Sequence, residues 1–225
     1  FGNDVDMDDI IWMGAQPLLK DRAAGVGVNN TAPYKELEGF LSKAKSQGRD
    51  IQILPPYRGE TKMEIERLTG VNSHEVNTLI SQSFIKAVVD LRSVKDQFEI
   101  AEIEKAVDTA YLMHTTAMKM AKPGVSEQEI AGTVEGIALA NGGPVSFPVI
   151  LSINGQILHN HHHGNKLELG RMMITDAGAE TGMHYASDIT RTTPVGGKFD
   201  ERQKSVYEIV LEAIVKSSEA VKPGI

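Results

Sequence analysis

The chain has 225 residues, with 23 Lys and Arg against 30 Asp and Glu, and the resulting net charge of −7 argues against nucleic acid as a partner. Its hydrophobic fraction of 41% and charged fraction of 24% are ordinary for a globular protein and exclude disordered, collagen-like and coiled-coil classes. There is no cysteine for a disulfide or thiolate site, and no apolar run approaches the ~20 residues of a membrane span. We therefore expect a cytoplasmic protein without membrane partners.

Residues 1–90 form the first predicted unit, in which helices and strands alternate as in a small α/β domain. The patterns predict strands over 10–13 and 51–54, helices over about 31–45 and 73–82, and a further apolar segment at 87–90. No cluster of catalytic residue types occurs in this unit.

Residues 91–225 form the second predicted unit, which begins with two helices. Ser93 is the expected N-cap of a long helix that runs to about residue 119, and Ser126-x-x-Glu129 predicts a second helix that ends near residue 141. The pattern then changes to a period of two, which predicts two hairpins: 145–153 with 156–159 around Asn154-Gly155, and 172–180 with 184–193. A last helix is expected over 201–221.

A four-residue echo suggests an internal repeat. Lys122-Pro123-Gly124-Val125 and Lys222-Pro223-Gly224-Ile225 each follow a long amphipathic helix, one hundred positions apart. Lys-Pro-Gly is also a common helix stop, so the echo alone is weak. If it is a repeat, the second copy is cut after its first helix, and we expect the chain to be a fragment.

The main chemical signal is a pair of carboxylates in the second hairpin. A three-residue loop, 181–183, would place Asp176 and Asp188 directly opposite each other on one face, with Cβ atoms roughly 4.5–5.5 Å apart. Two carboxylates this close repel each other unless they share a proton or bind a cation. One or two divalent metal ions bound between the carboxylate oxygens would offset the repulsion. The alternative is that both carboxylates are solvated or that one caps a turn, and a two-residue loop would put them on opposite faces.

The histidines offer weaker signals. His159 ends the predicted return strand, and a neutral imidazole is a good ligand or proton shuttle. We interpret His161, His162 and His163 as solvated polar residues, His114 as a packed helix residue and His74 as a surface cap near a helix start. By parity His184 could face the metal side, but no other feature of the sequence supports this.

The segments Ile157-Leu158-His159, Asp176-Ala177-Gly178 and Ser187-Asp188-Ile189-Thr190-Arg191-Thr192 together resemble the metal-dependent proline peptidases. These are the Xaa-Pro aminopeptidases and prolidases of the pita-bread fold. The resemblance covers roughly residues 90–225, and residues 1–90 look like part of the creatinase-type N-terminal domain. The implied fold is thus a partial α/β domain over 1–90 followed by the first part of a pita-bread α+β catalytic domain over 91–225. The Asp176-to-Asp188 spacing is one residue longer than the commonest family pattern, and Asn160 stands where many members carry an aromatic residue.

The resemblance implies a site and a reaction. Asp176 and Asp188 would be metal ligands, His159 would contact substrate near the scissile bond, and Thr190 would orient a carboxylate. Two divalent ions, usually Mn²⁺ with Co²⁺ or Zn²⁺ as alternatives, would hold the hydroxide that attacks the peptide carbonyl. The substrate would be a peptide with proline in second position, and the family expectation for assembly is a homodimer.

The family's remaining ligands, one His and two Glu, are expected beyond Ile225. We therefore predict that the full-length protein is an exopeptidase and that this chain alone is inactive. Two other interpretations stay open: a non-catalytic pita-bread module that binds peptides, and a metal-free hydrolase of the creatinase type. Opposed carboxylates argue against both, because neither needs them.

Overall fold

The computed structural model describes residues 1–223 and divides into two compact units, Phe1–Val94 and Lys95–Ile225. The sequence places the boundary at 90/91, and the assignment of the two parts to a creatinase-type domain and a pita-bread domain stays a prediction. Residues 224 and 225, half of the second Lys-Pro-Gly echo, lie outside the described residues. No helix in the described part is long and apolar enough to cross a membrane.

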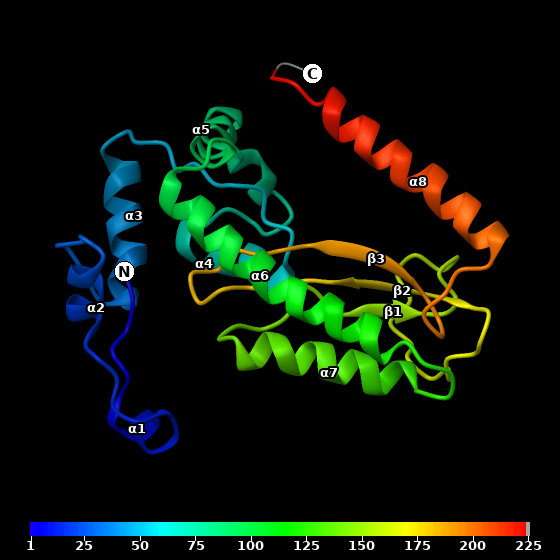
Figure 1. Cartoon of the computed structure of the whole chain (residues 1–225). Helices are drawn as coiled ribbons and strands as arrows, with labels where there is room; N and C mark the ends of the chain where they lie inside the picture. Colours follow the sequence, from blue (N-terminus) through cyan, green and yellow to red (C-terminus); the bar gives the residue numbers. More distant parts are fainter. Residues whose placement is uncertain (224–225) are drawn as a thin grey trace. The chain divides into compact units, whose positions relative to one another are not determined.

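The first unit is helical (Figure 1). Its elements are α1 (Met7–Met13), α2 (Leu19–Gly25), η1 (Tyr34–Glu36), α3 (Leu37–Ser46), α4 (Gly59–Thr69), η2 (Val76–Leu79) and α5 (Gln82–Ser93). The predicted strand at 10–13 is wrong, because Asp6 caps a helical turn there by accepting from the Asp9 amide. The predicted strand at 51–54 is reduced to one bridge between Ile53 and Ile80. Apolar runs of four residues do not distinguish strand from helix by periodicity.

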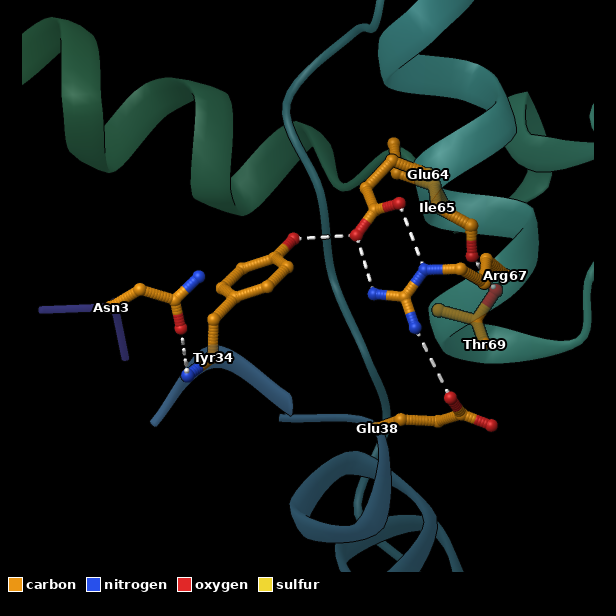
Figure 2. Close-up of polar contacts among 7 residues, drawn as sticks. All are labelled: Asn3, Tyr34, Glu38, Glu64, Ile65, Arg67 and Thr69. Atoms are coloured by element: carbon orange, nitrogen blue, oxygen red, sulfur yellow. Dashed lines mark hydrogen bonds and ion pairs between the residues drawn. The ribbon is translucent and has the colours of Figure 1, made fainter. Parts of the chain in front are cut away.

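A polar network joins three elements of this unit (Figure 2). The Tyr34 hydroxyl of η1 donates to Glu64 Oε1 at 2.6 Å. Arg67 on α4 donates through Nη2 and Nε to the two oxygens of Glu64 at 2.6 and 2.9 Å, and through Nη1 to Glu38 Oε2 of α3 at 3.2 Å. Glu64 thus receives three hydrogen bonds.

The second unit contains α6 (Gln97–Met120), α7 (Glu127–Ala140), β1 (Ile150–Ser152), β2 (Met172–Ala177), β3 (Ile189–Pro194) and α8 (Glu201–Ala220). The strands form an antiparallel sheet in the order β1-β2-β3. Figure 1 shows α6 and α7 lying along one face of this sheet, and the hydrophobic core fills the layer between them. Its largest fully buried apolar side chains are Met113, Ile130, Leu151, Leu167 and Met173.

Two of the three predicted helix starts in this unit are confirmed. Ser126 caps α7 by accepting from the Glu129 amide, and α8 spans nearly the predicted range, with Asp200 as its cap. The predicted cap Ser93 is wrong: its hydroxyl donates to Val89 within α5, and Asp96 instead forms a capping box with Glu99 at the start of α6.

The first predicted hairpin is also wrong. β1 pairs with β2, not with residues 156–159, and residues 154–164 form a loop without strand structure. The amide of Ile153, which a hairpin would use, donates instead to the buried carboxylate of Glu127 at 2.7 Å. The second hairpin exists as β2 and β3, each shorter than predicted.

Candidate metal-binding site

The register of the β2–β3 ribbon differs from the predicted one by two residues. Asp176 lies opposite Thr190, and the same pairing continues to a bridge between Glu180 and Ala186. The connecting loop is therefore the five residues 181–185, closed by hydrogen bonds between Thr181 and Tyr185. The prediction that Asp176 and Asp188 are directly opposed is wrong: they are diagonal neighbours, about 7 Å apart at Cβ.

The two carboxylates nevertheless share one face of the ribbon. Residues 173, 175 and 177 of β2 are buried against the helices, so Asp176 faces the other side. Ser187 is buried, and its hydroxyl donates to Ala106 of α6 at 2.8 Å. Because side chains alternate along extended chain, its neighbour Asp188 faces away from α6, on the same side as Asp176.

Thr190 is the nearest polar partner of Asp176. Its hydroxyl donates to Asp176 Oδ1 at 2.6 Å across the ribbon. Within residues 1–223, Oδ2 of Asp176 and both oxygens of Asp188 form no other hydrogen bond, so they are available to other partners. Hard divalent cations take such carboxylate oxygens as ligands.

His159 lies in the loop that follows β1. It is exposed and forms no hydrogen bond within the described residues. The loop starts over the carboxylate face, because Gly155 lies against Ile174, whose side chain shares the face of Asp176. A cavity of about 430 Å³ there is lined by residues of the loop, β2, β3 and α8, among them Gly155, Ile174, Thr192 and Gln203.

The other histidines differ in their burial and in their hydrogen bonds. His114 is buried at 4% exposure with Nε2 3.1 Å from the Ala177 carbonyl oxygen, and burial lowers its pKa, which confirms the packed interpretation. His163 Nδ1 lies 3.1 Å from the Leu151 carbonyl oxygen, and His184, in the loop 181–185, lies 2.5 Å from Glu180 Oε1. His74, His161 and His162 are exposed.

The donor set on this face is incomplete as a metal site. No group of three or more His, Asp or Glu side chains within residues 1–223 could hold a metal ion. The oxygen atoms of two carboxylates and one hydroxyl are suitable ligands for a divalent cation. They are, however, fewer than the ligands that such a cation takes in a complete site. Sequence reasoning missed Ser187 and Glu127, which support this region, because no local signal marks either.

The second unit is thus an antiparallel sheet backed by two helices, with Asp176 and Asp188 on the face opposite those helices. The sequence profile of Metallopeptidase family M24 matches residues 101–225, more than half of the chain, and the chain belongs to this family.

Relatives agree with this assignment over nearly the whole chain. A probable Xaa-Pro aminopeptidase of Neosartorya fischeri is 29% identical over 98% of the chain, and an Xaa-Pro dipeptidase of Pyrococcus horikoshii is 31% identical over 94%. The chain covers 48% and 64% of these two proteins, respectively. It thus spans about half the length of most of the curated relatives that it matches.

Solved structures confirm the fold class. A variant of Escherichia coli aminopeptidase P in complex with substrate is similar over 100% of the chain and 52% of its own, with a TM-score of 0.81 and 26% identity. A prolidase from Pyrococcus furiosus is similar over 65% of the chain and 48% of its own, with a TM-score of 0.58 and 32% identity. The predicted resemblance to aminopeptidases and prolidases is therefore confirmed.

Proposed function

We propose that the full-length protein is a metal-dependent exopeptidase that releases the N-terminal residue from peptides with proline in second position. The observation that carries this proposal is the shared face of Asp176 and Asp188, with Thr190 bonded to Asp176, in a member of a metallopeptidase family. Relatives named Xaa-Pro aminopeptidase and Xaa-Pro dipeptidase support the substrate class.

Each residue has a distinct role in this proposal. Asp176 and Asp188 would hold two divalent cations, Mn²⁺ in preference to Co²⁺ or Zn²⁺. When bound, such cations lower the pKa of water and polarise the scissile carbonyl. Thr190 holds Asp176 in one orientation through its 2.6 Å hydrogen bond, and His159 would contact the substrate near the scissile bond.

The small number of metal-ligand side chains leads us to propose that residues 1–225 alone are inactive. Within residues 1–223 no third His, Asp or Glu completes a metal-binding group with the two aspartates. Two carboxylates without further ligands bind a divalent cation weakly. Further ligands would have to come from another segment of the full-length protein.

The test is release of the first residue from an Xaa-Pro-Xaa tripeptide by the full-length protein with Mn²⁺, followed by mass spectrometry. We expect turnover that EDTA abolishes, and a loss of more than about 100-fold in D176N and D188N, because even groups that only support metal ligands contribute 10–100-fold. D108N is the matched control, since Asp108 is exposed on α6. Full activity of D176N or D188N would contradict the proposal, and turnover by residues 1–225 would contradict the inactivity of the chain.

The second candidate function is a non-catalytic module that binds peptides. It would bind Xaa-Pro peptides without turnover and without sensitivity to EDTA, so the same assay separates the two. A homodimer and a cytoplasmic location belong to our proposal as family expectations, to be measured by light scattering and cell fractionation.

A further inference from the structure

Glu127, the first residue of α7, is the most deeply buried charged side chain of the second unit. Its exposed fraction is 0%. A buried carboxylate is costly unless hydrogen bonds replace its lost water. The proposed reaction does not use this group, so its presence requires another reason.

The carboxylate of Glu127 binds both ends of one loop. Oε1 accepts from the Ile153 amide at 2.7 Å, at the end of β1. Oε2 accepts from the Asn165 amide at 3.3 Å and from Asn165 Nδ2 at 2.9 Å. The Glu127 amide in turn donates to the Asn165 carbonyl at 2.9 Å. One side chain therefore closes the loop 154–164 at its base.

This loop carries His159 and starts over the carboxylate face, where Gly155 lies against Ile174. Further bonds support its base: Arg171 Nη2 donates to the Ile153 carbonyl at 2.9 Å and to Asn154 Oδ1 at 3.0 Å. Compact loops whose ends lie close together are frequently functional. His159 itself is exposed, and its neighbour Asn160 donates through Nδ2 to Ser152 Oγ of β1 at 3.3 Å. The base of the loop and this contact together set where the imidazole lies.

We propose that Glu127 is a positioning residue that places His159 over the Asp176 and Asp188 face by holding the two ends of the loop 154–164. This inference deepens the proposed function, since it assumes that His159 contacts the substrate. All three groups that Glu127 binds are donors, and a carboxylate accepts at both oxygens. In E127Q, the amide nitrogen would face a donor at one end of the loop.

Hydrogen exchange tests the structural half of the proposal in residues 1–225. We expect E127Q to speed exchange of the Ile153 and Asn165 amides by about tenfold or more, because hydrogen bonds to charged groups are the stronger ones. Exchange in β2 should not change. E129Q is the matched control, since it removes an exposed carboxylate two residues along the same helix. N165A removes only the Nδ2 bond and should have a smaller effect at that end, because the backbone bonds between residues 165 and 127 remain.

Kinetics of the full-length protein test the functional half. We expect E127Q to lower kcat about 100-fold, since a misplacement of about 1 Å costs that much, and to change KM little. In the background of H159A, E127Q should cause no further loss, because the two residues act as a unit. E127D keeps the charge and should restore part of the rate.

Different outcomes overturn different statements. Unchanged exchange in E127Q overturns the loop anchoring. An equal loss of kcat from E127Q in wild-type and H159A backgrounds overturns the positioning of His159, because it shows a general structural effect. Absence of turnover in the wild type overturns the proposed function, while the exchange experiment still decides whether Glu127 holds the loop.

Discussion

The hydroxyl of Thr190 determines how the carboxylate of Asp176 is turned. Their 2.6 Å hydrogen bond crosses the ribbon between directly paired residues of β2 and β3. The backbone carbonyl of Thr190 also accepts from Arg191 Nη1 at 2.8 Å. A hydrogen bond of this kind restricts a ligand's orientation before a cation arrives, which reduces the entropy lost on binding.

Replacing Thr190 by valine keeps the side-chain shape and removes the donor. We expect T190V to weaken Mn²⁺ binding by the full-length protein about 10–100-fold, measured by calorimetric titration. The unfolding free energy in EDTA should fall by only about 0.5–1.5 kcal/mol, the net value of one hydrogen bond. T190S retains the hydroxyl and serves as the control. Wild-type affinity in T190V would show that the hydroxyl does not orient a ligand.

The β2–β3 ribbon depends on close backbone contact at Gly178, the residue paired with Asp188 in the observed register. A Cβ at position 178 would lie 1.8 Å from the Ser187 carbonyl oxygen and 2.5 Å from Ser146 Oγ. Ser146 Oγ donates to that same carbonyl at 2.6 Å, so three segments meet there. The space that glycine leaves is what lets the strands approach beside the two aspartates.

Substituting Gly178 by alanine should therefore destabilise the second unit. We expect G178A to lower its unfolding free energy by about 1–3 kcal/mol, as for other overpacked sites, measured by chemical denaturation. G182A is a matched control in the same hairpin, because no atom lies within 4 Å of a Cβ built there. Equal stability of the two variants would contradict the role given to Gly178.

Each unit of the protein has its own source of stability. The second unit has an apolar core between its sheet and two helices. In the first unit, the bonds around Glu64 join η1, α3 and α4 (Figure 2). The hydrogen bonds from Arg67, which have the larger effect, and from Tyr34 lower the pKa of Glu64 from 4.5 to about 2. The same contact with Glu64 raises the pKa of Tyr34.

The lowered pKa of Glu64 predicts a dependence of stability on acid. A depressed carboxyl pKa stabilises the folded state above the unfolded value of 4.5, and this stabilisation is lost as the pH falls towards about 2. We expect E64Q to reduce the acid sensitivity of the first unit in this range, measured by hydrogen exchange of α4 amides. E60Q, which alters an exposed residue of the same helix, should retain the wild-type profile. An unchanged profile in E64Q would exclude this network as its source.

Long segments with a regular apolar pattern were predicted correctly, and short apolar runs were not. The long helices α6, α7 and α8 follow from apolar periodicity and local caps, which are properties of neighbouring residues. The short runs at 10–13 and 51–54 were misassigned because four residues carry no distinguishing period. The prediction of a hairpin at Asn154-Gly155 was wrong for another reason. The carboxylate of Glu127, distant in the sequence, accepts a hydrogen bond from the Ile153 amide, which the hairpin would have used.

The sequence predicted that Asp176 and Asp188 share a face of the ribbon, provided that the loop has an odd number of residues, as it does in the structure. Side chains alternate with a period of two along both strands, so a shift of the register by two residues preserves that face. Only the tertiary structure decided which residue opposes Asp176, and the observed register is accompanied by a hydrogen bond from Tyr185 of the loop to Glu99, 86 residues earlier. It alone also revealed that Glu127 holds Asn165, 38 residues later. Contacts between segments so far apart leave no local pattern, because either partner could satisfy its hydrogen bond with water or another residue.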